Sequence, residues 1–186
     1  MIKYFLPLSL VLFTLFGSIN CSYAQTKEER EFLKSLQNEK EINVILDMSQ
    51  VIIHGKTEAD FVYIEDVSSD EDWSSLWINK YRPSLFRDLL GELNSSMFDY
   101  GYTVRFGNFQ QAKYQIRLLV LSISEKGDTH IKVYYERAEE KQIIYSIVVY
   151  GHGGIFGSKV NLMGDGFKRA GVDLAKQTKR VFEWGR

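Results

Sequence analysis

The stretch Gln142 to Trp184, QIIYSIVVYGHGGIFGSKVNLMGDGFKRAGVDLAKQTKRVFEW, decides the fold. Its first part, Gln142 to Tyr150, is apolar and rich in β-branched residues, which is typical of a strand. The glycine-rich segment that follows predicts a turn. From Ser158 onward the apolar residues recur at helical spacing, so we expect a long helix that returns over a sheet.

The face of this helix that we expect to be buried combines glycine with larger residues at heptad spacing. It comprises Gly157, Val160, Gly164, Phe167, Gly171, Leu174, Thr178 and Val181. A glycine within a helix costs about 1 kcal/mol relative to alanine, so its recurrence predicts packing against bare backbone. Small residues at Gly166 and Ala170, and at Gly171 and Ala175, are equally suited to seat the helix of a second copy, so self-association stays open.

The rest of the chain supplies partners for this strand and helix. Strand patterns occupy Ile42–Met48, Tyr102–Phe106, Tyr114–Ser124 and Ile131–Tyr135. Pro83 opens a second amphipathic helix whose apolar stripe is Phe86, Leu89, Leu90, Leu93 and Met97, with Gly101 as its cap. Strands joined by short turns predict an α+β fold, with a mainly antiparallel sheet of about five strands and two long helices packed on one face.

Residues 1 to 24 have the features of a secretory signal peptide. Lys3 precedes a short uncharged apolar run, and small residues stand at the third and last positions before Gln25. We expect cleavage near Ala24, a periplasmic or secreted location, and a single domain over residues 25–186. An outer-membrane lipoprotein acylated at Cys21 is the alternative.

Charge and cysteine content disfavour several classes of protein. The chain has 23 basic and 24 acidic residues, so no global field favours nucleic acid or an anionic membrane. Cys21 is its single cysteine, which excludes disulfides and cysteine metal sites from residues 25–186. Acidic residues gather between Thr57 and Asn79, as a solvated face or as a weak calcium site around Asp66, Asp70 and Asp72.

His54-Gly55-Lys56-Thr57 has the closing order of a phosphate-binding loop. The motif also requires a glycine five residues before Gly55, where this chain has Gln50. Thr57 followed by Asp60 instead predicts the cap of a short helix.

Trp73, Trp77 and Tyr81 follow one another at four-residue spacing, which puts them on one side of a helical stretch. Such an aromatic stripe is usually core. A carbohydrate-binding surface at Trp73 and Trp77 is the alternative function if the rings are exposed.

His54 and His152 each end a predicted strand beside a glycine. If the fold brings them together with a carboxylate from Asp47 or Asp165, they would make a zinc or iron site. A small hydrolase or metal-binding protein is therefore a second alternative function.

The glycine-rich loop is the main candidate binding site, through Gly151, His152, Gly153, Gly154 and Gly157. Consecutive amides at a helix start can form an anion-binding nest. The competing interpretation is a sharp turn before a close-packed helix. A dinucleotide fingerprint is excluded because Phe156 stands where its third glycine should be.

The stretch from Gly153 to Phe167, GGIFGSKVNLMGDGF, resembles small exported proteins of Gram-negative bacteria of the Bacteroides type. More loosely, the strand, glycine loop and closing helix look like modules of periplasmic and outer-membrane lipoproteins, such as the amino-terminal domain of TolB and the curli secretion lipoprotein. The resemblance implies a non-catalytic binding or assembly module of the cell envelope with a protein partner or self-association. It implies no catalytic residue, metal or cofactor.

Overall fold

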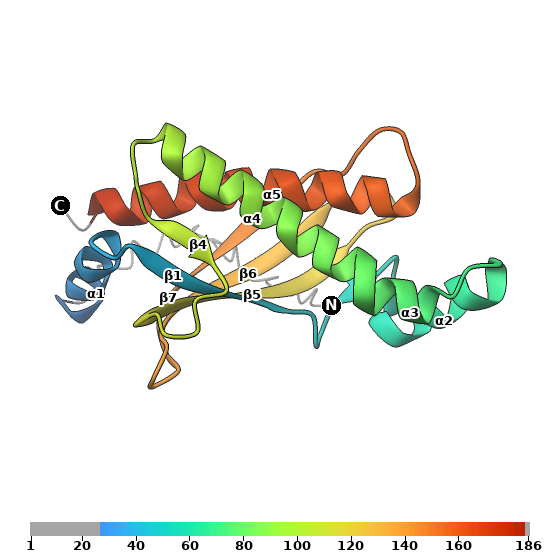
Figure 1. Ribbon diagram of the computed structural model, residues 1–186, viewed down its shortest axis with the longest axis horizontal. Helices are drawn as coiled ribbons and strands as arrows, with labels where there is room; N and C mark the ends of the chain where they lie inside the picture. Colours follow the sequence, from blue (N-terminus) through green and yellow to red (C-terminus); the bar gives the residue numbers. More distant parts are fainter. Residues whose placement is uncertain (1–26, 185–186) are drawn as a thin grey trace, which may run out of the picture.

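A computed structural model describes residues 27–184 (Figure 1). The elements, in chain order, are α1 (Lys27–Gln37), β1 (Glu41–Asp47), β2 (Ile52–Ile53), β3 (Lys56–Thr57), α2 (Glu58–Ser68), α3 (Trp73–Leu76), the π-helix η1 (Trp77–Tyr81), α4 (Arg82–Asp99), β4 (Arg105–Gly107), β5 (Tyr114–Ile123), β6 (Thr129–Arg137), β7 (Gln142–Gly151) and α5 (Lys159–Trp184). The predicted signal peptide and the alternative lipidation at Cys21 lie outside the described residues. None of the helices described has the length and apolar character needed to cross a membrane.

The seven strands form one mixed sheet with β5 at its centre. On one side β5 pairs with β6, and β6 with β7, both antiparallel. On the other side β5 pairs in parallel with β1 along its first half and with β2 near its end. The outer row consists of β4, parallel to β1, and β3, antiparallel to β2.

This architecture corrects the predicted fold class. The fold is α/β with a mixed sheet of seven strands, whereas the sequence predicted α+β with a mainly antiparallel sheet of about five. The chain leaves β1, crosses through the helices from α2 to α4, and returns in β4 and β5, and such a crossover makes strands parallel. The predicted meander is found in β5, β6 and β7.

The two long helices, α4 and α5, lie side by side on one face of the sheet, as predicted (Figure 1). The buried face of α5 carries the predicted stripe from Gly164 to Val181, although Gly157 precedes the helix and is exposed. On α4 the buried face is rotated from the prediction, because Leu85 is buried and Phe86 is only partly so. Gly101 has the φ of +84° expected of a helix cap.

Four glycines bring backbone against backbone where α5 and the loop before it meet the sheet and the turn between β5 and β6. A Cβ atom on Gly166 would lie 1.9 Å from the carbonyl oxygen of Gly127, and one on Gly151 would lie 1.8 Å from the carbonyl oxygen of Gly166. A Cβ atom on Gly153 would lie 1.7 Å from the carbonyl oxygen of Lys126. We call Gly127, Gly151, Gly153 and Gly166 the glycine seam. No side chain fits at these distances, so the seam fixes how α5 sits on the sheet.

The glycine face of α5 packs within its own chain. At Gly171 a Cβ atom would lie 2.4 Å from the carbonyl oxygen of Leu89 in α4, which confirms the predicted contact with bare backbone for this glycine. A Cβ atom on Gly164 would instead meet the side chain of Asp88, at 3.3 Å. Gly166, Ala170, Gly171 and Ala175 are all buried. A second copy therefore has no access to this face, and the predicted use of these small residues for self-association is wrong.

His54 and Gly55 form the two-residue turn between β2 and β3. Their φ angles are +51° and +77°, the combination required by a type I′ hairpin. The Thr57 side chain accepts a hydrogen bond from the Asp60 N–H at 3.2 Å and donates one to the Asp60 carboxylate at 2.7 Å. The predicted helix cap is confirmed, and the residues that imitate a phosphate loop build a hairpin and a cap.

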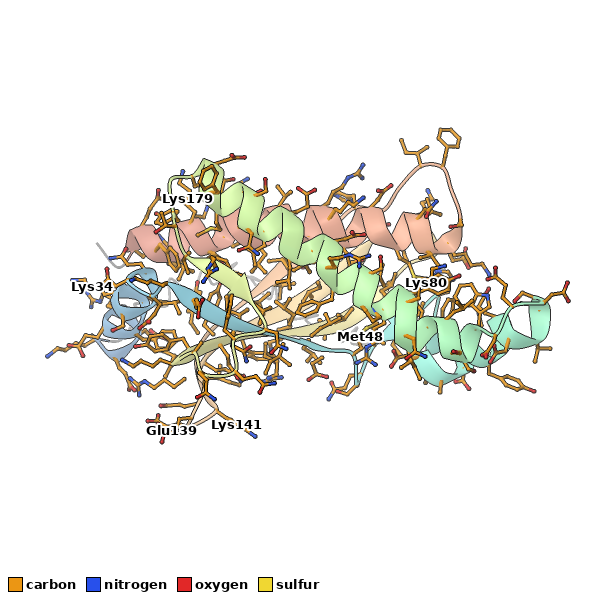
Figure 2. The ribbon with its side chains drawn as sticks, viewed as in Figure 1. Lys34, Met48, Lys80, Glu139, Lys141 and Lys179 are labelled. Carbon is orange, nitrogen blue, oxygen red and sulfur yellow. The ribbon has the colours of Figure 1, made fainter. Side chains whose placement is uncertain are left out.

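Charged side chains gather on turns and outward faces. Glu139 and Lys141, in the turn between β6 and β7, point away from the ribbon (Figure 2). Within β6, which includes the predicted strand Ile131–Tyr135, buried and exposed residues alternate: Ile131, Val133 and Tyr135 are buried, while His130 is exposed. The apolar side of the meander therefore faces the helices.

Candidate functional site

The loop of residues 152–158, which joins β7 to α5, contains most of the predicted binding residues. We call it the glycine loop. Its base is held by two side chains from different elements. The Gly153 N–H donates to the Asp128 carboxylate at 2.9 Å, and Arg169 of α5 donates to the carbonyl oxygens of His152 at 3.1 Å and Gly153 at 2.8 Å. The loop is thus fixed where it leaves β7.

We call Asp128 and Arg169, which hold the base of the loop by these hydrogen bonds, the clamp. Asp128 is its central residue. The hydrogen bond from the Gly153 N–H holds the pKa of the Asp128 carboxyl below its ordinary value, against the opposing effect of burial. The Ser124 hydroxyl, which donates to Asp128 at 3.0 Å, and His152, whose Nδ1 lies 3.7 Å from the carboxylate, lower it further. The carboxylate therefore stays ionised at neutral pH and keeps the loop base in place.

The glycines of the loop allow close approach. Besides Gly153 in the seam, Gly154 is closely packed, because a Cβ atom there would lie 2.5 Å from a carboxylate oxygen of Asp165, which would have to move. The Gly153 amide, which we considered as part of an anion nest, already binds the carboxylate of Asp128. This donor is used inside the protein.

The tip of the loop carries two large apolar side chains that were not predicted as binding residues. Ile155 is 83% exposed and Phe156 is 89% exposed. Figure 1 shows the loop between β7 and α5 projecting from the body of the molecule. In the sequence these residues stand between Gly154 and Gly157, outside the periodic patterns on both sides, and that isolation was the available signal.

Trp73 and Trp77 belong to the core. Both indoles are buried, and Phe61 contacts both edge to face, with ring centroids 5.9 Å and 5.6 Å away. The indole N–H of Trp77 donates to Glu58 at 2.7 Å. Phe61, Trp73, Trp77 and Tyr81 form what we call the aromatic cluster. The core interpretation is confirmed, and burial of both rings contradicts a carbohydrate-binding surface built on them.

The two histidines have different surroundings. His54 packs edge to face against Phe61 at 5.1 Å, and its buried Nε2 lacks a hydrogen-bond partner within the described residues. Burial lowers the pKa of His54, and the cation of Lys159 lowers it further. His152 is exposed beside Asp128 on the glycine loop.

Within residues 27–184, no three His, Cys, Asp or Glu side chains are grouped in a way that holds a metal ion. The carboxylates considered for metal sites have other partners. Asp47 accepts from Ser49 and faces Arg117 at 3.6 Å, while Asp66 accepts from the backbone and hydroxyl of Ser74. The described geometry therefore offers no support for the metal-binding alternative.

No model of a known protein family matches the chain, and no curated protein matches it in sequence. Among solved structures, the chain is similar to a dodecamer of PelC from Paraburkholderia phytofirmans, with 7% sequence identity and a TM-score of 0.39. The aligned part covers 73% of this chain and 89% of that chain. The likeness is distant and defines no function for this chain.

Proposed function

We propose that the protein is a non-catalytic binding or assembly module of the cell envelope, which contacts a protein partner through the tip of the glycine loop. The observation that carries the proposal is the adjacent, almost fully exposed pair Ile155 and Phe156 on a clamped loop. Isolated apolar residues are common on protein surfaces, whereas a projecting apolar pair is a typical anchor for a partner's pocket.

The clamp favours binding of a partner to the loop tip, because it orders the loop in advance. Asp128 and Arg169 hold the base of the loop before any partner arrives, so less conformational entropy is lost when the tip is seated. Gly153 and Gly154, which pack tightly beneath the tip, limit its movement further. The predicted binding loop thus acts through the residues between its glycines. The predicted signal peptide supports the assignment to the envelope.

A protein partner fits the surroundings of the tip better than an anionic membrane does. Surfaces that bind such membranes present clusters of available Lys and Arg. Beside this loop, Lys159 pairs with Glu65 at 2.5 Å and Arg169 donates to the loop carbonyls, whereas Lys126, whose backbone packs against Gly153, is exposed. The carboxylates of Asp128 and Asp165 lie against the loop as well.

Site-specific photo-crosslinking in cells that produce the protein naturally tests this proposal. A photoreactive phenylalanine is placed at Phe156 and, as a matched control, at Phe98 of α4, which is also well exposed at 75%. We expect a discrete protein adduct from position 156 that Ile155→Asp abolishes, with none from position 98. Lipid adducts would point to a membrane instead, and equal labelling from both positions, or none, would contradict the proposal.

A further inference from the structure

The outer row of the sheet has a gap beside β1. β1 pairs with β5 along Asn43–Asp47, but on its other side it pairs with β4 only along Glu41–Asn43. The next strand of the outer row, β3, pairs with β2 instead. Among the described strands, none lies beside residues 44–47, a length of about 13 Å at the usual rise of about 3.3 Å per residue.

A groove of about 510 Å³ opens at this gap. Backbone and side chains of β1 form one wall, the start of α4 and η1 form the second, and the loop after β4 closes one end. The residues that matter for the argument are Val44, Ile45, Leu46, Ile78, Arg82 and Phe86. Its size lies in the usual range for binding pockets, and its lining is mainly apolar.

The backbone of β1 gives this groove a specific chemistry. Along a strand, the N–H and C=O groups of successive residues point to alternate sides, so part of those in residues 44–47 points away from β5 and into the gap. Open strand edges of this kind are templates for another extended chain, which supplies the missing hydrogen bonds. An occupant in any other conformation would leave these groups unpaired.

The charge of the groove limits which kind of segment can bind there. Among the residues that line the groove, Arg82 carries the charge, and its side chain is partly exposed. It lies 3.5 Å from a carboxylate oxygen of Glu58, and that same oxygen also accepts the indole N–H of Trp77. A guanidinium has five N–H donors, so Arg82 can bind a second carboxylate while it keeps Glu58.

We propose that this groove binds an extended, apolar segment of a partner protein, which adds as a strand beside β1 and places a carboxylate at Arg82. The neighbouring π-helix is consistent with such a site, because π-helical turns are rare and occur frequently at functional sites. Ile78 of this π-helix is exposed and lines the groove. It also lines a second, mainly apolar groove that extends to Tyr63 of α2. The site shares no residue with the glycine loop, so either proposal can fail without the other.

The test uses random ten-residue peptides displayed on phage and selected on the purified protein. Soluble copies of the selected peptides are then measured against three variants. Ile78→Arg fills the groove, Arg82→Gln removes its charge, and Val67→Arg is the matched control, because Val67 is equally exposed on α2 but outside the groove. Thermal melts check that each variant is folded. If Ile78→Arg does not fold, the affinity of Arg82→Gln for the peptides tests the proposal.

We expect the selected peptides to alternate apolar residues and to carry an acidic residue. Their binding should weaken at least about tenfold in both groove variants, the effect of an interface hot spot, and should be unchanged in the control. Amide exchange at residues 44–47 should slow when peptide is bound. Failure to select peptides, affinity that is unaffected in both variants, or protection elsewhere in the chain would each overturn the proposal.

Discussion

The glycine seam and the aromatic cluster pack the interior by opposite means. In the seam, the nearest atom to each added Cβ would be a backbone carbonyl oxygen, at 1.7 to 2.1 Å. In the cluster, rings meet at centroid distances between 5.1 and 5.9 Å. Side chains can adjust their rotamers, whereas backbone held in a sheet and a helix cannot. The seam should therefore be the less tolerant region, although its residues are the smallest.

The largest effect is expected from Gly166→Ala. The new methyl group would require α5 to move off Gly127, so we expect a loss of more than about 5 kcal/mol, which only severe lesions cause. Urea denaturation followed by circular dichroism measures it. Gly91→Ala is the matched control, because nothing lies within 4 Å of its added Cβ atom, and it should stabilise α4 by roughly 0.5–1 kcal/mol. Similar outcomes for the two variants would refute the rigidity of the seam.

Trp77→Ala should come next, at about 3–5 kcal/mol, the usual cost of emptying a large buried aromatic site. Trp77→Phe should cost less, because a ring remains against Phe61, and the loss is limited to part of the indole volume and the hydrogen bond to Glu58. The same denaturation assay compares them. If the two variants lost equal stability, ring packing would not be what holds this region.

Tyr135→Phe tests a polar contact between β6 and α5. The Tyr135 hydroxyl is buried and hydrogen-bonds with the Thr178 hydroxyl at 2.9 Å, so its removal leaves a buried group without a partner and should cost about 1–3 kcal/mol. Tyr134→Phe is the control on the opposite face of the same strand and should be nearly neutral. Equal losses would show that the bond to Thr178 contributes nothing.

The smallest effect concerns pH and His54, which touches the aromatic cluster through Phe61. Because the folded protein lowers the pKa of His54 below its ordinary 6.5, the unfolded chain takes up the proton first. The stability linked to His54 is thus complete above pH 6.5 and is lost as pH falls toward the lower pKa of the folded state. His54→Asn, which tolerates the positive φ, should flatten this dependence in thermal melts at several pH values. An unchanged pH profile would exclude His54 as its source.

Sequence patterns predicted the long periodic elements well and the short ones poorly. The helix from Ser158 and the alternation in β6 were accessible because many residues repeat one period. β2 and β3 have two residues each, too few for any period, and β2 joins the sheet by pairing with residues of β5 that are far away in sequence. The mainly antiparallel sheet was predicted wrongly because the parallel pairing of β1 with β4 and β5 follows from a long crossover that leaves no local pattern.

The sequence predicted the position of the glycine loop from its glycines, but it did not predict the exposed residues of the candidate site. The sequence marked Gly151, Gly153 and Gly154, and the structure places them under the loop as packing elements. Exposure of Ile155 and Phe156 is a three-dimensional property, as is the separate environment of each histidine. The gap beside β1 could not be predicted, because it depends on where β4 stops pairing.

The clamped loop and the seam beneath it give the molecule a mechanical character. A pulling force applied at Phe156 would be transmitted to α5 by the hydrogen bonds of Arg169 and by the backbone contacts of the seam. We expect the loop and α5 to deform little before these contacts break. Under increasing tension the loop should transmit force faithfully, and it should then yield in one abrupt step, when the helix and sheet separate along their glycines.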